Sequence, residues 1–226
     1  RFSAPLVDKV LLTHNLPEPD LLAGRRFGFQ LQRIHNSAPL GFGANNNQAF
    51  KHCQSEWFLV LNPDIRFDGE VLGPLIGQAV ARAGLMAPRI MEPGKTEPEQ
   101  HRRIITPLEI LTRRRPGYPI PSEPDWIPGL FMLFRSEAFR DIGGFDDRRY
   151  FMYGEDFDIC ARLRLAGWQL QIGEQLRARH EAQRASRTSW RHLWWHATSL
   201  LKLWASGPFW RLRCRLAAHA PGPSGH

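Results

Sequence analysis

Short apolar runs and helical patterns follow one another along the first 180 residues. The run 57–61 (Trp-Phe-Leu-Val-Leu) is apolar, aromatic and branched throughout, which is typical of a fully buried strand. Similar runs predict strands at 10–15 and near 31–34. From Asp156 onward, apolar residues recur at helical spacing, so a helix is expected to begin there.

The C-terminal region has a strong helical repeat. Its apolar positions are Trp190, Leu193, Trp194, Ala197, Leu200, Leu201 and Trp204. The repeat opens after Thr188-Ser189 and stops at Gly207-Pro208, and a second helix is expected from Phe209. We therefore expect a basic, Trp-rich helical tail over residues 187–226, following a domain over residues 1–186.

Charge distinguishes this tail from the rest of the chain. Residues 177–226 hold nine Arg or Lys and one acid, whereas residues 1–176 hold 21 of each sign. Amphipathic helices rich in Trp and flanked by Arg favour the headgroup region of an anionic bilayer. The alternatives are packing on the sheet or on a second subunit, so a homodimer remains open. Nucleic acid is also compatible with basic and aromatic residues; the catalytic-looking acids argue against it, and we expect no nucleic-acid partner.

Three acids lie within an otherwise apolar stretch at 151–163. Glu155 and Asp156 fall at the expected helix N-terminus, where the helix dipole stabilises carboxylates. The alternative interpretation is an ordinary helix cap. Asp158 points elsewhere on the helix and is expected to form a salt bridge.

Two further patterns precede this stretch. The 57–61 strand ends in Asn62-Pro63-Asp64, and ligands of open α/β sheets bind just outside such strand ends. The Asp64 carboxylate suits a hard cation that bridges phosphates, although a plain turn would look the same. Upstream, Gly41-Phe42-Gly43-Ala44-Asn45-Asn46-Asn47 leads into an expected helix and would let a ligand approach the backbone, unless it is simply a loop and helix cap.

The order of these motifs is more specific than any of them. Gly-Phe-Gly-Ala-Asn-Asn is followed by Leu-Asn-Pro-Asp, Trp-Ile-Pro-Gly, Gly-Gly-Phe-Asp, Phe-Met-Tyr-Gly-Glu-Asp-Phe-Asp, Ala-Gly-Trp and a histidine. From Val10 to Leu200 the chain resembles family 2 glycosyltransferases, and within them the bacterial rhamnosyltransferase-like branch. The resemblance implies an α/β fold, the nucleotide-diphospho-sugar transferase (GT-A) fold, with a mostly parallel sheet and helices on both faces.

The resemblance also implies roles for single residues. Asp64 would hold Mg²⁺ or Mn²⁺ against the donor diphosphate, and Asn62 replaces the first acid of the family's metal motif. Asp156 would be the general base, with Glu155 beside it. His180 matches a histidine that can reach the metal; a strand-end histidine without that role is the alternative.

Other positions are expected to line the binding sites. For the donor they are Asn15, Gly41, Gly43 and Asn46, together with Asn62 and Asp64. For the acceptor pocket they are Gly129, Gly144, Phe145 and Asp146, where glycine permits tight turns and close approach. Between the two halves, the proline- and arginine-rich segment 91–124 is expected to be a mobile acceptor-side segment.

The beginning of the chain departs from the family pattern. Too few residues separate Asn15 from Gly41 for another helix and strand, so the 10–15 strand corresponds to the family's second strand, and the first strand and helix are expected to be absent. Base recognition would then be compromised and a strand edge exposed. A fragment, a degenerate protein and a protein completed by a partner all fit this pattern.

Composition limits the size of the core and the cellular setting of the protein. With 42% hydrophobic residues, the 226-residue chain can form one good-sized core. Three cysteines without metal-site spacing favour a reduced, cytoplasmic setting, and no apolar run is long enough to span a membrane. We therefore expect a cytoplasmic protein, peripheral on the inner face of the cell membrane if the tail binds lipid.

These patterns together predict an inverting, metal-dependent glycosyltransferase. The expected donor is a nucleotide-diphospho-sugar, with dTDP-rhamnose favoured, and the expected acceptor is a saccharide or lipid-linked saccharide of a cell-surface polysaccharide. A non-catalytic scaffold that binds a membrane or a partner through its basic tail is the alternative. A metal-dependent phosphohydrolase is weaker, because a two-metal site requires more ligands than Asp64 and His180.

Overall fold

The computed structural model describes residues 4–92, 94, 102–112, 115, 124–181 and 190–219. Its strands are β1 (Lys9–His14), β2 (Gln30–His35), β3 (Trp57–Leu61), β4 (Ile65–Arg66), β5 (Ala83–Met91), β6 (Phe131–Arg135) and β7 (Gln169–His180). Its helices are η1 (Ala4–Leu6), α1 (Phe42–Phe50), α2 (Leu72–Gly77), α3 (Pro107–Thr112), α4 (Ser136–Asp141), α5 (Glu155–Leu165), α6 (Trp190–Trp204) and α7 (Gly207–His219). The expected strands and helices are therefore confirmed to within one or two residues of their bounds.

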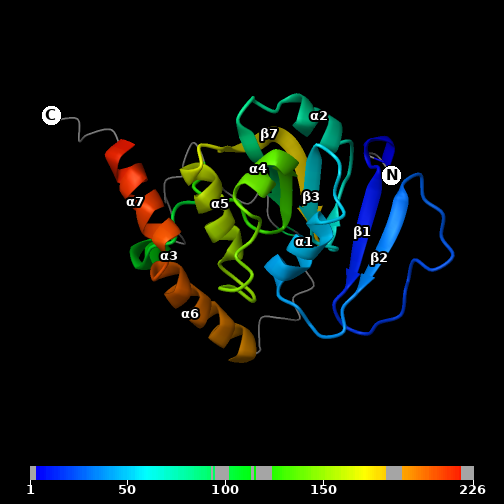
Figure 1. Cartoon of the computed structure of the whole chain (residues 1–226). Coiled ribbons are helices and arrows are strands. Elements are labelled where there is room, and N and C mark those ends of the chain that lie inside the picture. Colours follow the sequence, from blue (N-terminus) through cyan, green and yellow to red (C-terminus); the bar gives the residue numbers. More distant parts are fainter. Residues whose placement is uncertain are drawn as a thin grey trace.

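The central sheet has the strand order β3-β6-β5-β7-β4, with helices on both sides (Figure 1). Strands β5 and β7 run parallel, but β6 is antiparallel to both β3 and β5, and β4 is antiparallel to β7. The α/β fold class is thus confirmed, whereas the expectation of a mostly parallel sheet is wrong. The reason is β6, whose 131–135 run is buried at four of five positions and is inserted between β3 and β5.

Aromatic side chains fill the core on the side of α1 and α4. The rings of Phe50, Phe58 and Phe139 meet with centroids 4.4 to 5.3 Å apart. Phe134 and Phe145 extend this cluster toward the loop after α4. Such packing fixes α1 and the 143–147 turn against the sheet.

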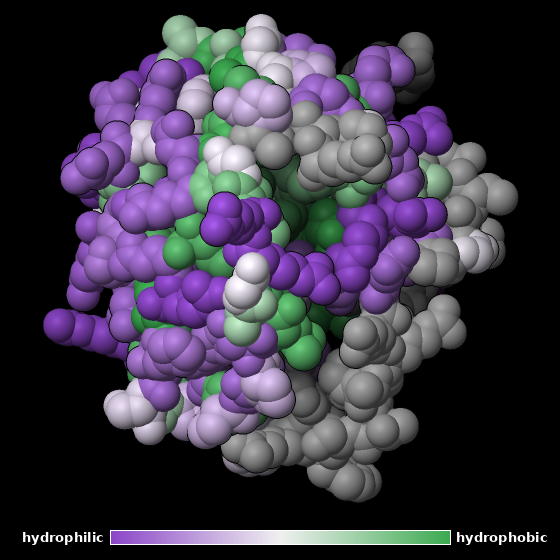
Figure 2. All heavy atoms as spheres, turned by 90° about the vertical axis from the view of Figure 1, so that its right-hand side faces the viewer, coloured by the Kyte–Doolittle hydropathy of each residue, from purple (hydrophilic) through white to green (hydrophobic). Residues whose placement is uncertain are grey.

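Strands β1 and β2 form a separate parallel pair, in register from Lys9 with Gln30 to His14 with His35. In Figure 1 this pair lies beside β3, on the side of the molecule away from α6 and α7. Viewed from that side, the surface is mostly hydrophilic, with a recess partly lined by hydrophobic residues (Figure 2). Among the described residues, β1 pairs with β2 alone. The expectation that the family's first strand is absent and leaves a strand edge exposed stays a prediction.

The C-terminal helices pack on α5. Leu203, Phe209 and Leu212 are buried, and the Phe209 ring lies 5.8 Å from that of Phe157 in α5. Trp204 Nε1 donates to the carbonyl of Ile105, just before α3. The basic tail therefore shares the core of the preceding residues, and its status as a separate domain stays a prediction.

The proline-rich segment 91–124 is described only in part. Residues 93, 95–101, 113–114 and 116–123 lie outside the described residues, and so does most of the expected mobile segment. The sequence of this segment showed no apolar periodicity, yet its described part contains the short helix α3. No helix in the described part of the chain is both long and apolar enough to cross a membrane.

Candidate active site

Strand pairing brings Asp64 and His180 together across 116 residues of sequence. The Asn62-Pro63-Asp64 turn leads directly into β4, whose Ile65 is opposite His180 at the end of β7. His180 Nε2 lies 3.0 Å from Asp64 Oδ2, and the backbone amide of Glu181 donates to the carbonyl of Asp64. The side chains are 14% and 28% exposed, so the pair lines a partly open edge of the sheet.

Each side chain of this pair has an atom that could coordinate a cation. Asp64 Oδ1 and His180 Nδ1 are buried and have no hydrogen-bond partner in the structure. A carboxylate oxygen with an imidazole nitrogen fits Mn²⁺ better than Mg²⁺, which prefers oxygen alone. No group of three His, Cys, Asp or Glu side chains with metal-site geometry occurs within the described residues, so substrate oxygens or water would complete the coordination of a cation here.

The second cluster lies at the start of α5. Tyr153 and Gly154 both adopt left-handed backbone conformations, with φ of 69° and 87°, and turn the chain into the helix at Glu155. Asp156 Oδ1 accepts the amide of Phe157 at 2.8 Å, and Oδ2 accepts the amide of Gly129 at 3.3 Å. The Gly129 amide thus holds the expected base. The sequence placed Gly129 at an acceptor pocket instead, and that role stays a prediction.

Burial changes the protonation of both carboxyl groups. Desolvation, with the charge of Asp156 as a smaller cause, raises the pKa of Glu155 from 4.5 to about 8. Desolvation also raises the pKa of Asp156, but the amides of Phe157 and Gly129 and the Arg102 guanidinium oppose it. Glu155 Oε2 is buried without a hydrogen-bond partner. Desolvation therefore favours the protonated form of both acids, and Asp156, which accepts two backbone amides, is the better candidate for the charged base.

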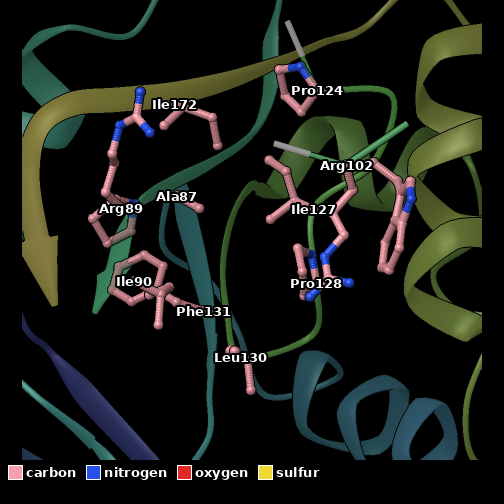
Figure 3. A pocket seen from close by; sticks show the side chains of 12 residues that line it. Ala87, Arg89, Ile90, Arg102, Pro124, Ile127, Pro128, Leu130, Phe131 and Ile172 are labelled. Atoms are coloured by element: carbon pink, nitrogen blue, oxygen red, sulfur yellow. The ribbon is translucent and has the colours of Figure 1, made fainter. Parts of the chain in front are cut away.

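A pocket lies next to this cluster, between β5 and the segment 124–131. Figure 3 shows Ala87, Arg89 and Ile90 on one side of it, and Arg102 and Pro128 on the other. The Arg102 guanidinium also lies over the Trp126 ring, 5.3 Å from its centroid. The lining is mostly apolar with two arginines, a composition suited to a ligand with an apolar ring and negative charge.

One backbone contact joins the two clusters. The amide of Asn62 donates to the carbonyl of Leu130 at 3.0 Å, where the end of β3 lies beside the start of β6. Asp64 is two residues beyond Asn62, and Gly129 directly precedes Leu130. The Asp64–His180 pair and the Glu155–Asp156 pair therefore lie on neighbouring parts of one sheet edge.

The glycines expected to admit a donor serve packing. A Cβ at Gly41 would lie 2.3 Å from the carbonyl oxygen of Phe151, and one at Gly43 would lie 2.8 Å from Phe145 Cβ. The amide of Phe42 donates to the same Phe151 carbonyl. These glycines thus dock α1 against the loop that precedes Glu155 and Asp156, and their contact with a donor stays a prediction.

An asparagine cluster holds the ends of β1 and β2. Asn15 accepts the amide of Leu40 through Oδ1 and donates to its carbonyl through Nδ2. Asn36 Nδ2 donates to both Asn15 and Asn45. Asn15 therefore orders the loop before α1; a contact with a nucleotide base remains a prediction. Asn46 donates to the Phe42 carbonyl within α1.

Gly144, Phe145 and Asp146 lie around α1, and none of them lines the pocket of Figure 3. The Asn47 side chain accepts the amide of Phe145 and donates to its carbonyl. Gly144, with φ of 73°, would clash with Asn47 if it carried a Cβ. Gly144 instead borders a second, open hollow beside α1. Their role at an acceptor site stays a prediction.

Asp158 is buried and paired with Arg162 at 2.7 Å, as expected of a salt-bridging acid. Sequence reasoning did not assign Arg102 to Asp156, nor the stack of Tyr153 on His196, whose ring centroids are 3.5 Å apart. No spacing rule could have found either, since both join segments separated by more than 40 residues.

Fold and site together define an α/β protein of the nucleotide-sugar transferase type. A carboxylate–histidine pair and a pair of adjacent carboxyl groups lie at one sheet edge. The sequence profile of Glycosyl transferase family 2 matches residues 21–143, more than half of the chain, so the chain belongs to this family.

Named relatives agree with this assignment. The chain is 30% identical over 184 residues to rhamnosyltransferase WbbL of Escherichia coli K12, covering 72% of this chain and 69% of that protein. It is also 30% identical over 132 residues to an N-acetylglucosaminyl-diphospho-decaprenol L-rhamnosyltransferase of Mycobacterium tuberculosis, covering 50% of this chain. The match spans 43% of that relative, less than half its length.

Solved structures share the fold. GalNAc-T7 with UDP, GalNAc and Mn²⁺ superposes with a TM-score of 0.57 at 15% identity, over 77% of this chain and 37% of that chain. This likeness concerns the fold alone.

Proposed function

We propose that the chain is an inverting, metal-dependent glycosyltransferase that moves a sugar from a nucleotide-diphospho-sugar to a saccharide acceptor of a cell-surface polysaccharide. The Glu155–Asp156 pair is the observation that carries the proposal: Glu155 is buried, and Asp156 is half-buried and held by two backbone amides. The names of the relatives favour rhamnose, with dTDP-rhamnose as donor.

In this mechanism Asp156 removes the proton of the acceptor hydroxyl. The hydroxyl oxygen forms a bond to the anomeric carbon from the face opposite the diphosphate, and the bond from that carbon to the diphosphate breaks. The diphosphate leaves with the electron pair, and the configuration is inverted. General-base assistance of this kind contributes about 10² to 10⁴-fold.

Asp64 and His180 would hold the divalent cation through Asp64 Oδ1 and the imidazole. When bound, the cation neutralises charge on the departing diphosphate. Glu155, protonated and buried beside the base, keeps a second negative charge out of the site.

Asp156→Asn tests the assignment of the base. Asparagine keeps an acceptor oxygen for one of the two backbone amides, those of Phe157 and Gly129, but cannot take up the proton, so sugar transfer should fall by about 10² to 10⁴-fold. Nucleotide binding, measured calorimetrically on the same variant, should change by less than about three-fold. Asp158→Asn is the control outside the site. Full transfer by Asp156→Asn would remove Asp156 from the mechanism.

A further inference from the structure

Helix α6 has its apolar stripe on the outside. Trp194 and Leu201 are 70% and 64% exposed, and Ala197 and Ala205 between and beyond them are also exposed. These positions are three, seven and eleven residues after Trp194, so they form one narrow stripe along the helix. On the opposite side, Ser199, Leu203 and Ser206 are buried. Packing on the rest of the chain therefore leaves this apolar stripe uncovered.

Helices α7 and α3 add to the same end of the molecule (Figure 1). Trp210 is 49% exposed, and its indole Nε1 donates to the carbonyl of Trp204 at the end of α6. Leu108 and Leu111 of α3 are 69% and 71% exposed, and Trp204 bonds to the carbonyl of Ile105 just before them.

The charges carried by α6 and α7 themselves have one sign. Arg211 and Arg213 are exposed, and the Arg213 guanidinium lies 5.1 Å from the Trp210 ring centroid. Residues 190–219 contain no Asp or Glu. A two-fold interface between two copies would place like charges together, whereas an anionic lipid surface supplies the opposite charge.

We infer that the outer stripe of α6 with Trp210, Arg211 and Arg213 binds the headgroup region of an anionic membrane. Tryptophan and leucine side chains enter the interface while the arginines contact lipid phosphates. The inner side of α6 meanwhile holds the loop before Glu155: Ser199 Oγ donates to the Met152 carbonyl, and Lys202 Nζ to that of Arg149. The inference rests on the proposed function in one respect: a membrane bound to α6 would bring a lipid-linked acceptor to within one helix of Asp156.

Sedimentation with vesicles tests this surface without any donor sugar. The whole chain should sediment with vesicles of phosphatidylglycerol and phosphatidylcholine, and much less with phosphatidylcholine alone. Arg211→Gln with Arg213→Gln should weaken partitioning about five-fold per arginine, the equivalent of about 1 kcal/mol each. Trp194→Gln with Leu201→Gln should weaken it at least about ten-fold.

The controls lie at the other end of the molecule. Leu21, 82% exposed, and the exposed Arg25 and Arg26 lie between β1 and β2, so their glutamine variants should sediment like the unchanged chain. Equal loss in both sets of variants, or unchanged sedimentation of the α6 and α7 variants, would overturn the inference. A dimer in analytical ultracentrifugation that Trp194→Gln with Leu201→Gln converts to monomer, without vesicle binding, would overturn it in favour of a second copy.

Nucleotide binding by the unchanged chain, measured beside its vesicle binding, separates the two proposals. Vesicle binding without nucleotide binding would retain the membrane surface and reject the proposed function. Nucleotide binding without vesicle binding would do the reverse.

Discussion

Glu155 and Asp156 are neighbours in sequence with different surroundings. Asp156 receives two backbone amides, whereas Glu155 Oε2 is buried without a partner. Acidic residues at a helix start could be recognised in the sequence, but this difference could not, because Gly129 comes from a loop 27 residues away. The structure thus gives two adjacent acids different hydrogen-bond partners, which supports Asp156 as the proposed base.

Glu155→Gln should therefore stabilise the protein at alkaline pH. The folded pKa of about 8 lies above the unfolded value of 4.5, so the stability associated with the protonated group is fully present below pH 4.5 and is lost as pH rises through about 8. Glutamine removes this loss, which is on the order of a few kcal/mol. Urea unfolding at pH 5 and pH 9 measures the difference. Equal pH dependence in the variant and the unchanged chain would show that Glu155 titrates normally.

At the scale of elements, α6 contacts the loop that leads to the acids. Its start and end were predicted from periodicity, and the helix runs from Trp190 to Trp204 as expected. The side of α6 that packs on the rest of the chain was not predictable. If the helix packed on the sheet, its apolar stripe was expected to be the buried side. Instead Ser199 turns inward to the Met152 carbonyl, and Tyr153 stacks on His196.

Ser199→Ala should loosen this loop. The lost hydrogen bond leaves the half-buried Met152 carbonyl without its serine donor and should cost about 1 kcal/mol of stability. Since Tyr153 and Gly154 sit in left-handed conformations, a looser loop should lower kcat more than it weakens nucleotide binding. Thr198→Ala is the matched control, because its hydroxyl bonds only within α6. Similar kcat for both variants would argue against a positioning role of α6.

At the scale of the whole molecule, the site is assembled from three distant segments. Asp64 follows β3, His180 ends β7 and Asp156 begins α5. The order of motifs was enough to predict the fold class and these three residues, but not their contacts. The β4–β7 pairing that joins Asp64 to His180 depends on a two-residue strand, too short to be recognised in sequence. The antiparallel insertion of β6 was missed for a similar reason, since strand direction is set by tertiary packing.

Strands β1 and β2 form a pair of their own, separate from the central sheet. Recognition of the nucleotide base was expected to suffer because the family's first strand was expected to be absent. A chain that still binds a nucleotide diphosphate would have a working donor site in this arrangement. Donor binding therefore decides between the proposed transferase and a non-catalytic scaffold.

The most direct test is calorimetric titration of the chain with dTDP, UDP and GDP, each with and without Mn²⁺, repeated on Asp64→Ala. We expect one nucleotide, with dTDP favoured, to bind only when Mn²⁺ is present, and Asp64→Ala to weaken that binding at least about ten-fold while the fold is retained. Binding of none of the three nucleotides, or binding that neither Mn²⁺ nor Asp64 affects, would contradict a metal-dependent glycosyltransferase.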